Sequence, residues 1–87
     1  MNTAPNNKRI IINNAADVRT LIKMIDTWHE SYDVAAIRVG RGSPVIIFTF
    51  SEGRRIIANC GSHSAAYHLA NKLAPEYGHK PMHHHWF

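Results

Sequence analysis

The sequence predicts an α+β domain in which one four-stranded mixed sheet carries two helices on one face, in the order β-α-β-β-β-α. Three observations lead to this fold class. The chain has 87 residues, enough for one hydrophobic core but not for two. Two segments repeat apolar residues with the helical period, and four short apolar runs are bounded by turn residues, as strands are. Two amphipathic helices can both bury their apolar stripes by covering the same face of a sheet.

The first helix is predicted over residues 15–31. Asn14 precedes it as an N-cap, and Asp17 stands three residues later, a capping-box-like arrangement that also suits the helix dipole. Apolar side chains recur at spacings of three and four, which indicates one buried stripe: Val18, Leu21, Ile22, Ile25, Trp28 and Tyr32. The two aromatic residues of this stripe are therefore expected in the core.

The other elements follow from turn residues and alternation. We expect a loose tail over residues 1–7 and a single domain over residues 8–87. Strands are predicted over residues 8–13, 34–39, 45–50 and 54–60, with turns at residues 40–44 and 51–53. A second helix follows the break at residues 61–64 and ends before Pro75, and its stripe is Ala66, Leu69, Ala70 and Leu73. Residues 76–87 show no clear period.

The element order over residues 15–74, α-β-β-β-α, resembles that of double-stranded-RNA-binding domains. The family's lysine pair at the start of its last helix falls here at His63 and Ser64, so that pair is absent. The predicted strand before the first helix is an addition to the family's order. The resemblance therefore concerns topology alone.

One end of the predicted domain is a candidate anion site. If the first two strands run parallel, both helix N-termini and the turn at residues 40–43 share that end, and free backbone N–H groups there favour anions. The predicted residues for binding an anion or nucleic acid are Arg38, Arg41, Ser43, Arg55, Ser62 and His63. The alternative is that Asn14 and Ser62 only cap their helices and that the glycines only permit a tight turn.

The sheet face away from the helices is a second candidate. If Ile37, Phe48, Phe50, Ile56 and Ala58 face the helices, an aliphatic strip flanked by Arg38 and Arg55 faces outward. Nucleic acid could lie there with the arginines on phosphates, but the strip lacks aromatic rings on which bases stack. A partner protein or a second copy of the chain fits the aliphatic content at least as well. The predicted protein interface is Val45, Ile47 and Ile57, with Trp86 and Phe87, which either fold back or dock on a partner.

Several functional classes are disfavoured. No paired carboxylates, phosphate loop or dinucleotide fingerprint is present. Cys60 and His63 are poorly spaced to act as a nucleophile and its general base. We therefore expect neither an enzyme nor a cofactor. The histidines, which include His79 and residues 83–85, could bind a metal, but a single thiol accompanies them and no metal site is predicted. The lone cysteine, the polar N-terminus and the lack of a long apolar run favour the cytoplasm and no membrane partner.

The distribution of charge indicates what kind of partner the protein binds. The net charge is +4, and residues 34–87 hold six Lys or Arg against two Asp or Glu. Such a surface attracts polyanions or acidic proteins. The sequence therefore predicts a small, basic, non-catalytic binding protein for nucleic acid or another phosphate-bearing partner. The alternative is an accessory or inhibitor protein, of the kind found in phages and mobile elements, that blocks a host protein complex through the outward sheet face. A homodimer through that face is also possible.

Overall fold

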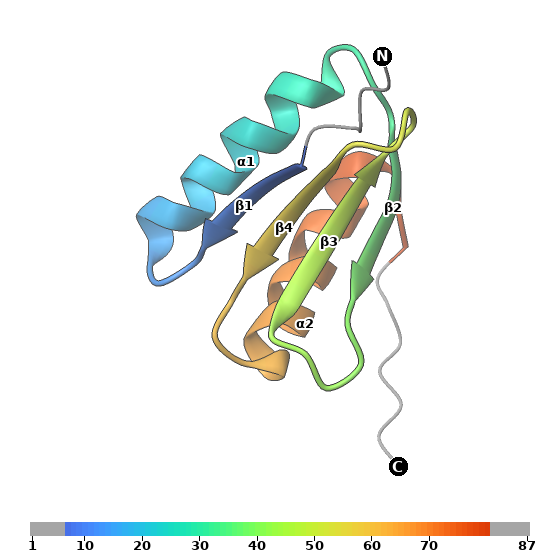
Figure 1. Ribbon diagram of the computed structural model, residues 1–87. Coiled ribbons are helices and arrows are strands. Elements are labelled where there is room, and N and C mark those ends of the chain that lie inside the picture. Colours follow the sequence, from blue (N-terminus) through green and yellow to red (C-terminus); the bar gives the residue numbers. More distant parts are fainter. Residues whose placement is uncertain (1–6, 81–87) are drawn as a thin grey trace, which may run out of the picture.

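The fold agrees with the predicted class. The computed structural model describes residues 7–80, which form a four-stranded mixed sheet with two helices in the order β-α-β-β-β-α (Figure 1). The elements are β1 (Asn7–Ile11), α1 (Ala15–His29), β2 (Val34–Val39), β3 (Val45–Phe50), β4 (Arg55–Asn59), α2 (His63–Leu73) and the 3₁₀ turn η1 (Ala74–Tyr77). None of the helices in residues 7–80 is both long and apolar enough to cross a membrane.

The sheet has the strand order β1-β4-β3-β2. β1 pairs with β4 in parallel, whereas β4 with β3 and β3 with β2 pair antiparallel. β1 and β2 therefore run in the same direction, as predicted, but they lie at opposite edges of the sheet. α1 lies in the connection from β1 to β2, α2 follows β4, and both helices pack against the sheet.

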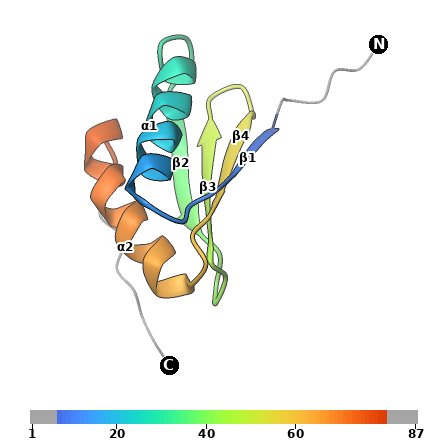
Figure 2. The ribbon, with the colours of Figure 1, turned by 90° about the vertical axis from the view of Figure 1, so that its left-hand side faces the viewer.

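Both helices cover the same face, and the other face is left open (Figure 2). α1 packs on β1 and β4, and α2 packs on β2 and β3. The predicted inward residues are all buried: Ile37, Phe48, Phe50, Ile56 and Ala58. The helices contribute the buried residues of both predicted stripes: Leu21, Ile25, Trp28, Ala66, Ala70 and Leu73. Trp28 meets Phe50 edge to face with 5.3 Å between ring centroids, which confirms its place in the core.

Both predicted helix caps are present. Asn14 Oδ1 accepts a hydrogen bond of 3.0 Å from the Asp17 backbone N–H, and Asp17 Oδ2 accepts one of 2.8 Å from the N–H of Asn13. Ser62 Oγ accepts a bond of 3.1 Å from the Ala65 N–H at the start of α2. These bonds satisfy backbone donors that have no partner within the helix.

The strand β2 differs from the expected alternation at its start. The pattern predicts Ala35 on the same side as Ile37, but Ala35 is exposed and Val34 is buried. The pairing with β3 shifts between Val34 and Ala36, a bulge that inserts one extra residue into the edge strand. The extra residue turns outward, and the two flanking residues keep their places in the ladder.

Candidate binding surface

Cross-strand pairing arranges the outward side chains in three rows. The central row crosses all four strands as Arg9, Ile57, Ile47 and Arg38. A second row holds Ile11, Asn59 and Val45, and a third holds Asn7, Arg55, Thr49 and Ala36. We call the side chains of these three rows the open face. The register thus brings together five residues that the sequence assigned to binding: Arg38, Val45, Ile47, Arg55 and Ile57.

The open face has an aliphatic centre and cationic margins. Ile47, Ile57 and Val45 are partly exposed, since neither helix of residues 7–80 covers this side of the sheet. Arg9 and Arg38 are exposed at the two ends of the central row. Ile11 is 65 % exposed, and no other large hydrophobic side chain of residues 7–80 is exposed to that degree. An apolar patch with a charged margin is typical of an interaction surface.

The arginines of the open face are not neutralised within the described part of the chain. The four strands contain no Asp or Glu. Two carboxylates have partners elsewhere: Glu52 pairs with Arg54, and Asp26 accepts a hydrogen bond from Tyr77. No carboxylate in the described chain forms an ion pair with an open-face arginine. The face therefore presents positive charge to any partner.

Arg54, although adjacent to Arg55, belongs to the opposite side of the sheet. Its guanidinium carbon lies 5.0 Å from the Trp28 ring centroid and 4.6 Å from that of Tyr32. This places the charge over two aromatic rings, an attractive arrangement that also fixes the side chain. Of two consecutive arginines, one therefore stabilises the fold and the other is available at the surface.

The predicted convergence at one end of the molecule is present. The first residues of α2 contact the turn between β2 and β3, because His63 Nδ1 donates to the Ser43 carbonyl at 3.0 Å. Next to it, the Cys60 N–H donates to the Pro44 carbonyl at 2.7 Å. Ile12, which follows β1 and precedes α1, lies at the same end, because its N–H donates to the Asn59 carbonyl at 2.8 Å. Both helix starts and the glycine turn thus share one end of the sheet (Figure 1).

The polar groups at this end are already used by the fold. Ser62 caps α2, the ring of His63 binds the Ser43 carbonyl, and Asp17 places a carboxylate in the first turn of α1. The glycines of the turn have structural reasons: a Cβ on Gly40 would lie 2.7 Å from that of Ser43, and Gly42 has a φ of 65°. Arg41 is exposed on this turn. Asn14, Ser62 and the glycines thus have the capping and turn roles of the alternative interpretation, and anion binding here remains a prediction.

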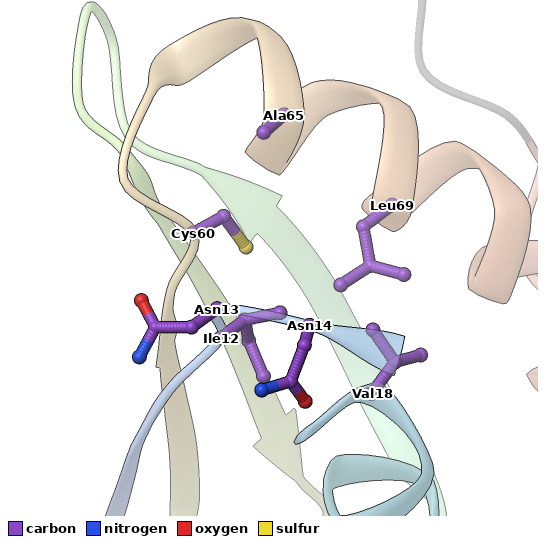
Figure 3. A pocket seen from close by; sticks show the side chains of 7 residues that line it. All are labelled: Ile12, Asn13, Asn14, Val18, Cys60, Ala65 and Leu69. Carbon is purple, nitrogen blue, oxygen red and sulfur yellow. The ribbon is translucent and has the colours of Figure 1, made fainter. Parts of the chain in front are cut away.

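A pocket of about 320 Å³ opens between the two helix starts (Figure 3). Its lining is Ile12, Asn13, Asn14, Val18, Cys60, Ala65 and Leu69, and apolar atoms dominate it. Val18 of α1 and Leu69 of α2 lie near each other in this view, and Cys60 lies across from them with its sulfur pointing inward (Figure 3). Burial raises the pKa of the Cys60 thiol, so the thiol stays protonated and is a weak nucleophile at neutral pH.

Cys60 and His63 each lie against a backbone carbonyl. His63 Nδ1 donates to the Ser43 carbonyl, and Cys60 Sγ lies 4.0 Å from the Ala58 carbonyl. In residues 7–80, no group of three or more His, Cys, Asp or Glu side chains is placed to hold a metal ion. His79 Nε2 donates to the Val34 carbonyl at 2.6 Å. The histidines at 83–85 and the predicted interface residues Trp86 and Phe87 lie outside the described residues.

The three open-face residues of β1, which are Asn7, Arg9 and Ile11, were not predicted from the sequence. Arg9 and Ile11 join it because β1 lies beside β4 with Arg9 opposite Ile57 and Ile11 opposite Asn59. The continuous apolar run at residues 10–12 has no alternation, so it does not show which side chains face outward. Lys8 and Arg9 are both charged and lie on opposite sides of the strand, so charge does not distinguish them either.

Comparison with known proteins gives no relative: no family model, curated protein or solved structure matches the chain.

Proposed function

We propose that the protein is a non-catalytic binding protein that docks its open face on an acidic surface of another protein and acts by occupying that surface. The observation that carries the proposal is the central row, in which two isoleucines lie between two arginines across the full width of the sheet. Such a protein works as an accessory factor or an inhibitor, because covering a partner's surface needs no catalytic group.

The aliphatic centre favours a protein partner. Ile47 and Ile57 form the middle of the row, and the exposed Ile11 extends the apolar area toward the β1 edge. Single-stranded nucleic acid is held by aromatic rings in most sheet-surface sites, and no aromatic residue belongs to the open face. Burying aliphatic side chains against another protein yields roughly 25 cal/mol per Å² of apolar area.

The arginines indicate the charge of that partner. Arg9, Arg38 and Arg55 surround the aliphatic centre and have no carboxylate partner in the described chain. Arginine is enriched at protein interfaces, since its guanidinium forms two parallel hydrogen bonds with a carboxylate. An acidic patch with a central apolar contact is the surface that complements this face.

Nucleic acid is the second candidate, and one observation favours it. Arg9 and Arg38 stand three strand spacings apart, about 14 Å between their backbones at the usual spacing of about 4.8 Å. Guanidinium groups spread over this distance can contact phosphates along one strand. In this case the isoleucines would contribute little, and affinity would be dominated by counterion release.

A charge-reversal pair of variants tests the proposal. Arg38→Glu reverses a charge on the open face, and Arg19→Glu makes the same change on the exposed side of α1, so both variants have the same net charge. Tagged wild type and both variants are used for affinity capture from a lysate of the natural host, with and without nuclease. We expect wild type and Arg19→Glu to retain a partner after nuclease treatment, and Arg38→Glu to lose it.

Direct binding then separates the two candidates. Fluorescent 30-nucleotide single-stranded and duplex DNA and RNA are titrated with wild type, Arg38→Glu and Arg41→Glu at several salt concentrations. Tight binding that weakens steeply with salt would establish the nucleic-acid candidate and contradict the protein candidate. Loss in Arg41→Glu alone would instead place the nucleic acid at the end where the helices begin. Capture that disappears with nuclease, or that Arg38→Glu leaves unchanged, overturns the proposal for a protein partner.

A further inference from the structure

The two edges of the sheet differ in whether another strand can join them. At the β2 edge, the bulge between Val34 and Ala36 disrupts the regular ladder, and His79 Nε2 occupies the Val34 carbonyl at 2.6 Å. β1 forms the other edge, its pairing with β4 is regular over all five residues, and no strand of the described chain lies beyond it. Figure 2 looks toward this edge.

The hydrogen bonds of β4 show which backbone groups of β1 point outward. The Asn59 carbonyl accepts from the Ile12 N–H, and the next residue, Cys60, donates to Pro44 on the β3 side. Successive residues of a strand direct their N–H and C=O groups to opposite sides. Lys8 and Ile10, like Ile12, therefore turn these groups toward β4, whereas Arg9 and Ile11 turn theirs away from the sheet.

The outward backbone groups coincide with the exposed side chains of the open face. Arg9 and Ile11 present both free hydrogen-bonding groups at the edge and side chains on the face, one cationic and one apolar. Lys8 adds a second cation on the other side of the strand, where its Nζ lies 5.3 Å from the Trp28 ring centroid. An unpaired edge is a template for strand addition.

We infer that β1 accepts an extended acidic segment of the partner protein as a fifth strand, which then continues across the open face. This inference rests on the proposed function, because it describes how the partner proposed for the open face would bind. Backbone hydrogen bonds at Arg9 and Ile11 hold the segment, and its carboxylates lie beside Lys8 and Arg9. An apolar residue of the segment covers Ile11.

Charge excludes the obvious competing occupant, a second copy of β1. In a two-fold antiparallel pair of β1 strands, the Lys8 and Arg9 side chains of both copies would gather along five residues without a carboxylate. Like charges on facing strands are destabilising. Cations on an edge strand thus oppose self-pairing and favour a strand of the opposite charge.

A model peptide tests the inference without knowledge of the partner. The probe is an acetylated and amidated octapeptide of two Glu-Glu-Val-Val repeats, which carries Glu and Val in alternation on each face of the strand. It is added to isotope-labelled protein while amide hydrogen exchange is followed by NMR. We expect saturating peptide to slow exchange at Arg9 and Ile11 at least fivefold and to leave the β2-edge amides of Ile37 and Val39 unchanged. One matched peptide replaces each Glu by Lys and the other carries an N-methyl group on every amide, and neither should protect any amide of the protein.

A pair of variants gives a second measurement. Arg9→Pro removes the outward donor, whereas Arg9→Ala removes the same side chain and keeps the donor. We expect Arg9→Pro to bind the Glu–Val peptide at least fivefold more weakly than Arg9→Ala, provided that both retain the wild-type NMR spectrum away from β1.

The outcomes against the inference are distinct. Unchanged exchange at Arg9 and Ile11 overturns it, and so does equal protection at Ile37 and Val39. Protection that rises with protein concentration in the absence of peptide assigns the edge to a second copy. Amide exchange measured in the captured complex distinguishes failure of this inference from failure of the proposed function. If capture of the partner requires Arg38 but the β1 amides stay unprotected in the complex, the partner docks on the open face without adding a strand to β1.

Discussion

The side chain of Tyr77 attaches the 3₁₀ turn η1 to α1. Its hydroxyl donates to Asp26 Oδ1 at 2.8 Å, and its ring meets that of His29 edge to face with 5.4 Å between centroids. Burial raises the pKa of the Tyr77 phenol above its ordinary value, and the hydrogen bond to Asp26 and the negative charges of Asp26 and Glu76 raise it further. All of these causes favour the neutral phenol in the folded state.

The sign of the pH dependence follows from this shift. A phenol whose pKa is higher in the folded state contributes stability below its unfolded pKa of about 10, and that stability is lost as the pH rises toward the folded value. We expect Tyr77→Phe to lower the free energy of unfolding at pH 7 by about 1 kcal/mol, the usual contribution of one hydrogen bond. The variant should then lose less stability than wild type above pH 10, as measured by urea denaturation.

An absorbance titration of tyrosinate supplies the control. The chain has three tyrosines. The last ionisation step should disappear in Tyr77→Phe and persist in Tyr67→Phe. A last step that persists in Tyr77→Phe would show that the bond to Asp26 does not hold the phenol neutral.

The helices and strands were predictable where a local signal determines them. The stripes of α1 and α2 follow the helical period, and Asn14 and Ser62 are good N-caps, because each side chain accepts from the backbone N–H three residues later. The bulge in β2 was not predictable, because its position depends on pairing with β3 rather than on the residues of β2. The place of β1 beside β4 is likewise a non-local property, and Arg9 and Ile11 were missed for that reason.

The capping of α1 leads to a quantitative prediction. Asn14→Ala removes the acceptor for the Asp17 N–H, a change that costs about 1 kcal/mol. We expect the melting temperature to fall by about 4–8 °C, the shift that 1 kcal/mol causes in a domain of this size. Asn13→Ala is the matched control, since the Asn13 backbone N–H rather than its side chain bonds to Asp17. Equal destabilisation by both variants would contradict the assigned cap.

At the scale of the whole molecule, the sequence predicts which elements meet at one end but not which side chains align across the sheet. The convergence of both helix starts with the glycine turn follows from strand directions alone, and it is observed. The alignment of Arg9 with Ile57, Ile47 and Arg38 needs the strand order and the register, which no local pattern contains. Three arginines on one face thus come from three strands that are distant in the sequence.

This arrangement determines whether the open face can pair with itself. Two copies joined face to face would bury their isoleucines, but they would also bring six arginines together with no carboxylate from the strands. Desolvating like charges at an interface opposes association, and salt weakens the repulsion between exposed charges. The wild-type protein is therefore expected to sediment as a monomer in low salt.

Removing the charge should release the aliphatic surface for self-association. We expect the double variant Arg9→Gln/Arg38→Gln to form a concentration-dependent dimer in sedimentation velocity, since it keeps Ile47, Ile57 and Ile11 and loses the repulsion. The control Arg19→Gln/Lys23→Gln removes two charges from the exposed side of α1 and should remain monomeric. A wild-type dimer that salt does not affect would show that the isoleucines dominate this face. The arginines would then have no part in selecting an acidic partner over a second copy of the chain.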